Sequence, residues 1–360
     1  MLNKREKKLK RKPNIIDVAR KAGVSQGTVS NYMNNSAPVN INTAKNISTA
    51  IYELNYIPDS TARSLRSGKT KLIGVIIPEL SDPYYSLMAD GIAESAYKNN
   101  YSIIIACNNY DHNQEKIQIK NLLSNNMSGF IFCCSGGDEN LLNLIIENDI
   151  PVVAIDRKME DQRIYSVEID NFKSFFNATT YLIKNGHKDI FYFSEPVLTG
   201  ILKDRLNGYK TALSENDIKI DDSKIIIDKS LQKDRPYGGY EIMKNLIKNN
   251  SILPGAVIST ADAIAYGAMK AVADNGFKVP QDISFIGNND SYLSKFVNPS
   301  LTTIRQPIKD MGKAGMDMII KLINKDTISG KKLIFETVLI ERDSVRNINI
   351  NQYLRPREVK

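Results

Sequence analysis

The 360-residue sequence is poor in side chains that form disulfides or bind metals, with three cysteines and two histidines. Cys107, Cys133 and Cys134 make a poor disulfide framework, and two of them are neighbours in an apolar run, so we expect buried thiols. His112 and His187 are the only imidazoles, and no CxxC pattern occurs. The sequence therefore predicts no metal site, and it contains no sign of a cofactor.

Long apolar runs are also absent. The sequence contains no run of about 18 apolar residues, the length that a membrane span needs. The charged residues 1–12 lead into no apolar signal-peptide core. With 42% hydrophobic residues spread over its length, the chain is typical of a soluble globular protein with two or three domains. We therefore expect a cytoplasmic protein.

The net positive charge lies in the first 69 residues. Residues 1–69 contain 13 Lys and Arg and 4 Asp and Glu, a net charge of +9, whereas the other 291 residues contain 35 and 36, a net charge of −1. A basic head on a neutral body is typical of a polyanion-binding part joined to a part with another role. Charge alone leaves open a solvated tail, but the residues inside the head favour DNA binding.

Two short helices are predicted in the head. Asn14 is a suitable N-cap for a helix over Ile15–Ala22, and Gly23 ends this helix by supplying the positive φ of a tight turn. Ser25 is a suitable N-cap for a second helix over Gln26–Met33. Two helices with so short a connection are typical of the helix-turn-helix, whose second helix enters the DNA major groove.

A third helix is expected over Ile41–Leu54. Its apolar positions close a three-helix core around Val29, and these positions are Ala44, Ile47 and Ile51. Beyond it, Asp59–Arg66 also has a helical pattern but is shorter than the roughly 12–15 residues that an isolated helix needs in water. Leu65 is then either exposed on this short helix or a core residue of the next domain.

From Lys71 onward, apolar runs alternate with amphipathic helices. The runs that predict strands are Leu72–Ile77, Ser102–Cys107, Gly129–Cys133, Pro151–Ile155, Ile190–Phe193, Ala256–Ser259 and Ile283–Ile286. The predicted helices are Tyr84–Asn99, Asn113–Asn125, Glu139–Asn148, Phe172–Asn185, Asp204–Glu215, Tyr237–Lys248, Ala263–Asn275 and Ile308–Ile323. This alternation predicts an α/β body with parallel sheets covered on both faces. No GxGxxG or GxxxxGK[ST] motif opens any of these helices, so a nucleotide-dependent enzyme is not indicated.

Polar residues after two of the predicted strands are candidates for a binding site, because ligands of such folds lie beyond the carboxyl ends of the strands. Asp82, Tyr84 and Tyr85 follow the first strand, where aromatic faces can stack on a ring. Asp156 and Arg157 follow the fourth and supply an acceptor and a planar donor fork, which suit adjacent hydroxyl groups. The alternatives are a structural ion pair between the lobes for Asp156 and Arg157 and a core or dimer-interface role for the two tyrosines.

Several segments carry a resemblance to a known family. They are residues 15–30 (IIDVARKAGVSQGTVS), 56–59 (YIPD) and 62–70 (ARSLRSGKT). In this order and spacing they resemble the lactose-repressor/galactose-repressor (LacI/GalR) family, and the match continues to about Arg346. The resemblance implies an all-α helix-turn-helix head and hinge helix, joined to a two-lobed α/β core with parallel sheets that is similar to periplasmic sugar-binding proteins.

The resemblance assigns DNA contacts within the head and hinge. Gln26, Gly27 and Asn31 occupy base-reading positions of the family. Asn31 stands where the family usually has Arg, which puts a guanine contact there in doubt. Thr28 and Ser30 are expected to contact phosphate. In the family, hinge helices of two subunits pair on DNA and the leucine wedges between bases in the minor groove. The predicted DNA-binding residues are Ser25, Gln26, Gly27, Thr28, Ser30, Asn31, Ala62 and Leu65.

It also assigns pocket residues in the body. Arg205 begins a segment, RLNGY, that resembles the pocket-arginine motif of the family, although a structural ion pair is an alternative role. Asn289 replaces a common effector-binding carboxylate, and Ala261 precedes Asp262 where the family often has Asn. The predicted effector-binding residues are Asp82, Tyr84, Tyr85, Asp156, Arg157, Asp170, Arg205, Asn289 and Gln306.

We therefore expect a homodimeric repressor of carbohydrate-utilisation genes. It would bind double-stranded operator DNA and a small effector, a sugar or sugar derivative, between the two core lobes. The alternative is a regulator of the same family controlled mainly by a protein partner. An enzyme is not expected, because neither histidine lies in a triad motif. A solute-binding protein would carry an export signal in place of the basic head. The C-terminal residues contain no leucine heptads, which favours a dimer over a tetramer.

The expected organisation has five parts. A basic extension covers residues 1–12, a helix-turn-helix domain 13–58, and a hinge helix with its linker 59–70. A two-lobed effector-binding and dimerisation domain covers 71–346, and a C-terminal tail covers 347–360.

Overall fold

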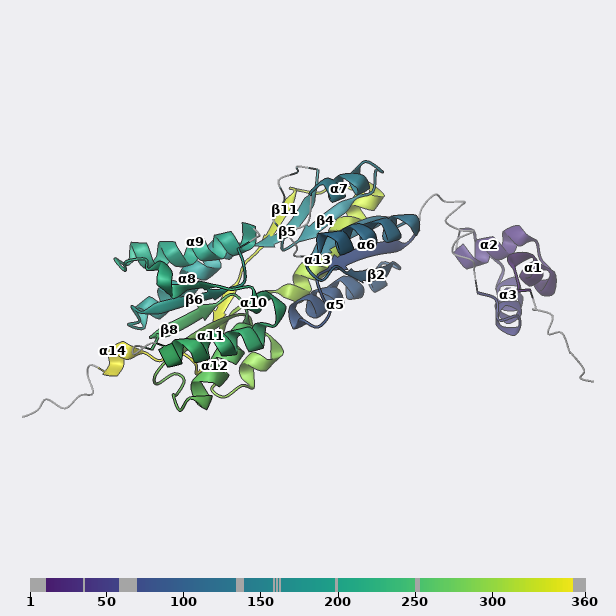
Figure 1. Cartoon of the computed structure of the whole chain (residues 1–360). Coiled ribbons are helices and arrows are strands. Elements are labelled where there is room, and N and C mark those ends of the chain that lie inside the picture. Colours follow the sequence, from purple (N-terminus) through teal and green to yellow (C-terminus); the bar gives the residue numbers. More distant parts are fainter. Residues whose placement is uncertain are drawn as a thin grey trace, which may run out of the picture. The chain divides into compact units, whose positions relative to one another are not determined.

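A computed structural model of the chain describes residues 11–34, 36–57, 70–133, 139–157, 159, 161, 163–197, 200–249 and 253–351. The chain divides into two units, Met1–Thr70 and Lys71–Lys360 (Figure 1). The predicted hinge helix, with Ala62 and Leu65, lies outside the described residues, as does Cys134. We describe the two units separately.

Three helices form the described part of the first unit: α1 (Ile15–Ala22), α2 (Gln26–Asn34) and α3 (Ile41–Glu53). Asn14 caps α1 as predicted, because its Oδ1 accepts from the amide of Asp17 at 3.1 Å while the Asp17 carboxylate accepts from the Asn14 amide at 2.9 Å. Gly23 ends this helix with φ 69°. The Ser25 hydroxyl accepts from the amide of Thr28 at 3.1 Å and so caps α2.

A small hydrophobic core joins these helices. Its buried members are Val18, Ala19, Val29, Ile47, Ala50 and Tyr56, and Ile51 packs against them. Ala44 was predicted to belong to this core but is only half-buried and does not belong to the cluster. The buried stripe of α3 therefore begins at Ile47 and continues through Ala50 toward the end of the helix.

The second unit has two lobes, and the N-lobe contains an all-parallel sheet in the order β11-β5-β4-β3-β1-β2. Its strands are β1 (Leu72–Ile77), β2 (Ser102–Cys107), β3 (Gly129–Cys133), β4 (Val152–Ile155), β5 (Tyr165–Ile169) and β11 (Lys332–Phe335). Its helices are α5 (Pro83–Lys98), α6 (His112–Ser124), α7 (Glu139–Ile146) and α13 (Ile308–Asn324).

The C-lobe contains a second sheet in the order β12-β10-β9-β8-β6-β7, in which only β12 is antiparallel to its neighbour. Its strands are β6 (Ile190–Ser194), β7 (Ile225–Ile227), β8 (Ala256–Ser259), β9 (Ser284–Asn289), β10 (Thr302–Arg305) and β12 (Val338–Ile340). The helices of the C-lobe are α8 (Asn171–Lys184), α9 (Gly200–Glu215), α10 (Ser230–Lys233), α11 (Arg235–Asn249), α12 (Asp262–Asp274) and α14 (Ile348–Asn351). Two 3₁₀ turns accompany them, η1 (Asp222–Lys224) and η2 (Tyr292–Lys295).

The central strands of each sheet are buried on both faces, which explains their continuous apolar runs. In β1, Ile73, Val75 and Ile77 point into a cluster with side chains of α5 and α13, whereas Ile76 points into the cluster beneath α6 and α7. Helices α11 and α12 cover one face of the C-lobe sheet, and α8 and α9 cover the other. The fold class predicted from the sequence is confirmed.

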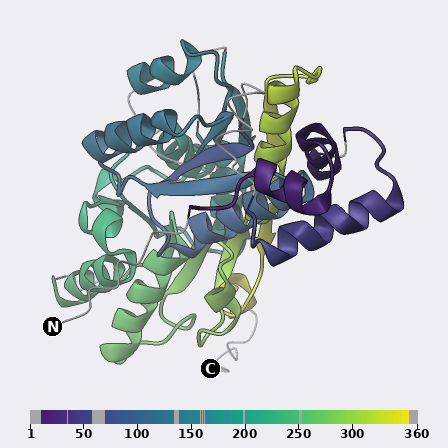
Figure 2. The ribbon, with the colours of Figure 1, turned by 90° about the vertical axis from the view of Figure 1, so that its right-hand side faces the viewer.

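Helix α13 belongs to the N-lobe although it follows the C-lobe strand β10. It packs closely on α5, and Figure 2 shows it beside the N-lobe sheet. A Cβ atom at Gly91 would collide with the carbonyl oxygen of Lys309, and one at Gly312 would collide with that of Met88. Glycine at these positions is therefore what allows the two helix backbones to approach each other.

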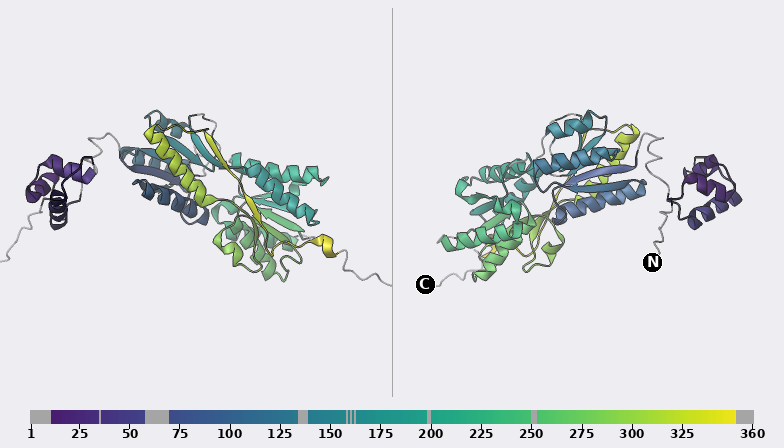
Figure 3. Two further views of the ribbon diagram at one scale, coloured as in Figure 1. Left: turned by 180° about the vertical axis from the view of Figure 1, so that it is seen from behind. Right: turned by 45° about the vertical axis from the view of Figure 1, so that its right-hand side comes forward.

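The described chain passes between the lobes at three places. The first follows β5 at Asp170, the second follows β10 at Gln306, and the third lies between β11 and β12 at residues 336–337. The last of these is visible as the yellow ribbon running between the lobes in Figure 3. Ser174 Oγ lies 2.7 Å from Thr337 Oγ1, which joins the first crossover to the third. The carboxyl ends of the parallel strands lie near these crossovers and position the residues described next.

Candidate functional sites

Arg205 of α9 is buried in the C-lobe. Its Nε donates to Asn171 Oδ1 at 2.7 Å, and its Nη1 donates to the carbonyl oxygen of Thr260 at 3.1 Å. Its guanidinium carbon lies 5.6 Å from the centre of the Phe175 ring. These partners are neutral, unlike those of the ion pair considered as an alternative, and they orient the guanidinium at the carboxyl end of β8.

A network of amide side chains lies beside Arg205. Asn288 Nδ2 donates to the same Thr260 carbonyl oxygen at 3.0 Å. Gln306 Nε2 donates to the Oδ1 atoms of Asn288 and Asn289, at 3.1 and 3.0 Å. Gln306 Oε1 is buried and has no hydrogen-bond partner among the described residues. This network therefore joins Arg205, Asn289 and Gln306, three of the predicted effector-binding residues, and it holds a buried acceptor.

Three further predicted residues meet in the N-lobe. Asp82 caps α5 by accepting from the Tyr84 amide at 2.9 Å, and the Tyr84 hydroxyl donates to Asp156 Oδ2 at 2.6 Å. Asp156 directly follows β4. Its φ of 48° is a left-handed conformation that places its side chain in the turn after the strand. The rings of Tyr84 and Tyr85 are only 7% and 5% exposed within the N-lobe core. In this conformation their hydroxyls, rather than their ring faces, contribute to the polar network.

Two further predicted effector-binding residues are Asp170 and Arg157. Asp170 is exposed, and its carboxylate accepts from the Lys173 amide at 2.8 Å, which caps α8 at the first crossover. Arg157 is buried with its guanidinium carbon 6.0 Å from the centre of the Phe132 ring. Asp170 therefore acts first as a helix cap, and Arg157 packs on an aromatic ring of the N-lobe.

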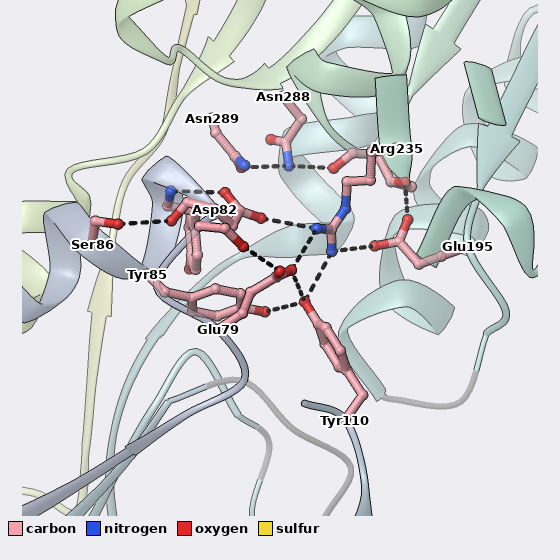
Figure 4. A network of polar contacts seen from close by, with 12 residues as sticks. Glu79, Asp82, Tyr85, Ser86, Tyr110, Glu195, Arg235, Asn288 and Asn289 are labelled. Atoms are coloured by element: carbon pink, nitrogen blue, oxygen red, sulfur yellow. Dashed lines mark hydrogen bonds and ion pairs between the residues drawn. The ribbon is translucent and has the colours of Figure 1, made fainter. Parts of the chain in front are cut away.

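Arg235, which the sequence analysis did not single out, joins the two lobes (Figure 4). This residue begins α11 of the C-lobe, and its Nη1 lies 2.9 Å from Asp82 Oδ2 of the N-lobe. Its Nη2 donates to the Tyr110 hydroxyl at 3.2 Å and lies 3.5 Å from Glu195 Oε1. Glu79 Oε1 of the N-lobe lies 3.6 Å from Arg235 Nη1. We call Glu79, Asp82, Tyr110, Glu195 and Arg235 the interlobe cluster.

Local sequence held almost no signal for the interlobe cluster. Arg235 stands two residues before the predicted helix Tyr237–Lys248, and Pro236 favours a helix start but indicates no contact with the other lobe. Its partners Asp82 and Tyr110 stand more than 100 positions away in the chain. A pattern search cannot supply such a pairing, because only the tertiary fold brings these segments together.

Burial shapes the electrostatics of this cluster. It raises the pKa of the Asp82 carboxyl, although Arg235 and the Tyr84 amide oppose the shift. Burial also raises the pKa of the Tyr110 hydroxyl. Burial by itself disfavours the charged form of Arg235, but Glu195 and the other acceptors around it outweigh this effect and raise its pKa. The guanidinium is therefore positively charged throughout the physiological pH range.

Asp262 is buried at the start of α12 and forms a separate polar centre. Its carboxylate accepts from the Ser291 amide at 2.6 Å and from the hydroxyls of Ser294 at 2.9 Å and Thr303 at 2.5 Å. Burial raises the pKa of this carboxyl although these donors lower it. The preceding residue, Ala261, makes no capping hydrogen bond with its side chain. Asp262 therefore holds the turn after β9, beside the Asn289 position.

In the first unit, Gln26 and Gly27 are exposed at the beginning of α2. The Thr28 hydroxyl lies 2.9 Å from the Ser25 hydroxyl, and both belong to the cap of this helix. Further along α2, Ser30 accepts from Asn34 at 3.3 Å, and Asn31 accepts from the Ser36 hydroxyl at 3.1 Å. Of the three predicted base-reading residues, Gln26 and Gly27 thus lie exposed at the start of the helix, whereas Asn31 forms a hydrogen bond with the segment after the helix.

Comparison with known proteins identifies the family. Residues 14–59 match the family described as "Bacterial regulatory proteins, lacI family", and residues 70–343 match "Periplasmic binding proteins and sugar binding domain of LacI family". The chain belongs to the LacI family. This LacI-family chain is a DNA-binding transcriptional regulator, and its relatives are regulators rather than enzymes.

Three relatives of this LacI-family chain are similar to it, and the first two cover nearly its whole length. It is 36% identical over 337 residues to the HTH-type transcriptional regulator RegA of Clostridium saccharobutylicum, covering 92% of this chain and 98% of the relative. The Lac repressor dimer bound to operator and the anti-inducer ONPF matches with a TM-score of 0.80 at 25% identity, covering 93% and 99% of the two chains. A LacI-type protein of Alkaliphilus metalliredigens QYMF in complex with D-xylulofuranose matches with a TM-score of 0.68 at 27% identity, covering 77% and 99%.

Within the described residues, none of the helices has the length and apolar character required to cross a membrane.

Proposed function

We propose that this chain is a repressor of carbohydrate-utilisation genes whose affinity for operator DNA is set by a sugar or sugar derivative bound between the two lobes. The observation that carries the proposal is the meeting of polar side chains from both lobes at the carboxyl ends of the parallel strands. Arg205, Asn289 and Gln306 lie at these ends in the C-lobe, and Asp82 and Asp156 lie at those of the N-lobe. The contact that joins the two sides is the one between Arg235 of the C-lobe and Asp82. Such paired donors and acceptors suit the adjacent hydroxyls of a sugar.

The proposed effector-binding residues remain those chosen from the sequence, but the tyrosines contribute hydroxyl groups rather than ring faces. Arg205 donates hydrogen bonds, and Asn289 and Gln306 offer amides. In the N-lobe, the hydroxyl of Tyr84 bonds to Asp156 and that of Tyr85 to Tyr110. The relative in complex with D-xylulofuranose, a neutral sugar, supports an effector of this class.

The proposed DNA contacts lie in the first unit and in the hinge segment. Gln26 and Gly27 would read base edges, and Ser25, Thr28 and Ser30 would position the head. Asn31, Ala62 and Leu65 complete the proposed DNA-binding set. We further propose that the protein acts in the cytoplasm as a homodimer, as the Lac repressor dimer on its operator supports. A two-fold dimer would place two heads on two half-sites.

A thermal-shift screen of sugars and their phosphates against the full chain tests the effector proposal. A ligand at 100 times its Kd stabilises the folded state by about 2.7 kcal/mol, a readily measured shift. Calorimetry on each hit and operator binding by fluorescence anisotropy, with and without the hit, then establish the linkage. If no sugar or sugar phosphate binds, the proposal is wrong, and control by a protein partner becomes the preferred hypothesis.

A further inference from the structure

Arg235 extends from the C-lobe to two carboxylates of the N-lobe, those of Asp82 and Glu79. Its side chain is 13% exposed, and those of Asp82 and Glu195 are 18% and 13% exposed. The pairs are therefore largely desolvated, unlike the solvated surface pair Arg163–Asp161, whose arginine side chain is 55% exposed. Pairs of the surface kind contribute little, whereas breaking a buried pair leaves an uncompensated charge.

We propose that Arg235 acts as an internal ligand of the N-lobe and that its contacts hold the two lobes together. The planar guanidinium reaches Asp82 with Nη1 and Tyr110 with Nη2, while Glu195 of its own lobe lies 3.5 Å from Nη2. A lysine at this position could not bind the two lobes in this way, because its ammonium is a single point of charge without the fork. This inference goes beyond the proposed function, because it concerns a contact within the chain rather than the binding of an effector.

The charges around Arg235 indicate how its removal would change the contact between the two lobes. Three carboxylates, those of Glu79, Asp82 and Glu195, surround the one guanidinium of Arg235. Removing the guanidinium would leave the N-lobe carboxylates of Glu79 and Asp82 facing the C-lobe carboxylate of Glu195. They would face each other across a poorly solvated contact between the lobes, which we call the seam. Like charges in such a place repel strongly. The lobes are therefore expected to separate more often without Arg235.

The interlobe cluster is also connected to the proposed effector site. The Thr260 hydroxyl donates to Glu195, and the carbonyl oxygen of the same residue accepts from Arg205. Asp82 belongs both to the cluster and to the set of proposed effector-binding residues. An effector that binds Asp82 must therefore either share the Asp82 carboxylate with Arg235 or displace the Arg235 guanidinium from it. The internal contact and the effector thus compete for the same carboxylate.

Hydrogen–deuterium exchange of the effector-free full chain tests this proposal. In Arg235→Gln, we expect amides of residues 82–86, 108–111 and 235–240 to exchange about tenfold faster, equivalent to about 1.4 kcal/mol of lost protection. The buried strands β3 and β8 should exchange as in the wild type. Asp82→Asn should reproduce the change, because asparagine can still cap α5 but carries no charge. The double variant should show no further increase.

The matched control is Arg163→Gln, which removes an exposed arginine that pairs only within its own lobe. It should leave exchange at the seam unchanged. Wild-type exchange at the seam in both Arg235→Gln and Asp82→Asn would overturn the proposal. An equal rise in β3, β8 and the seam would also overturn it, because it would show general loss of stability rather than separation of the lobes. If Arg235→Gln fails to fold, Asp82→Asn alone decides the outcome.

Discussion

Arg205 and Asn288 donate to the same acceptor, the carbonyl oxygen of Thr260, at 3.1 and 3.0 Å. Asn288 in turn accepts from Gln306, the residue at which the chain returns to the N-lobe. One backbone carbonyl at the end of β8 thus holds a charged donor fork and an amide network in a fixed relation. This arrangement makes Arg205 the most informative residue for testing the proposed site.

We predict that Arg205→Ala will weaken effector binding by about 1.5–3 kcal/mol, the contribution of hydrogen bonds that involve a charged group. Basal operator binding should remain nearly intact, because the proposed DNA contacts lie in the other unit. Calorimetry with the effector and anisotropy with operator DNA measure the two affinities. Normal effector affinity in this variant would show that the site has been assigned wrongly. Arg205→Lys is the control, since it keeps the charge but loses the fork.

Gln26→Ala is expected to relax base preference at one operator position, with a cost of about 1–3 kcal/mol there. The side chain is exposed at the beginning of α2, so its removal should not affect folding. Thr28→Ala is the companion variant and should weaken binding to all sequences similarly, because a phosphate contact carries no base information. Selection of binding sites from random DNA compares the two. An unchanged preferred site for Gln26→Ala would exclude it as a reader.

Removal of residues 1–69 should abolish DNA binding and leave a folded dimer. Those residues carry a net charge of +9, whereas the remainder carries −1. Binding by the full chain should also weaken steeply with salt, since each neutralised phosphate releases a counterion. Anisotropy titrations over a salt series, with sedimentation of the 70–360 fragment, measure both effects. Operator affinity retained by the fragment would contradict the division of roles.

Leu65→Ala should have the reverse profile of Arg205→Ala. We expect weaker operator binding, because an apolar side chain that wedges between bases contributes by unstacking and bending the DNA. The effector affinity of the free protein should stay unchanged. The same calorimetric and anisotropy measurements apply. Operator affinity equal to that of the wild type would favour the alternative in which Leu65 packs in the core.

The buried Asp262 carboxyl predicts a dependence of stability on pH. Because its pKa is raised in the folded protein, the folded state binds more protons than the unfolded state between the unfolded value near 3.8 and the higher folded value. Its contribution to the free energy of unfolding should therefore increase as the pH falls from neutral into that window. Urea unfolding of wild type and Asp262→Asn across this range isolates the effect. A difference between the two proteins that does not change with pH would contradict it.

Much of the architecture followed from local patterns. The first helix, its cap at Asn14 and the turn at Gly23 have short-range causes, so they were predictable from neighbouring residues. The long buried strands and amphipathic helices of the body also followed from apolar runs and helical periodicity. Five strands were not anticipated, namely β5, β7, β10, β11 and β12, which are only three to five residues long. Such short segments become strands through pairing with neighbours that are distant in sequence.

The sequence by itself determined the family, the two-unit plan and the polar residues that follow the strands, because these depend on motifs and local periodicity. Only the tertiary structure decided which of those residues meet. It joined Arg205, Asn289 and Gln306 through shared amides, placed Asp170 at a helix cap, and brought Arg235 to Asp82 across the two lobes. The physical reason is that the chain crosses between the lobes, so contacts at the seam join segments that no local pattern relates.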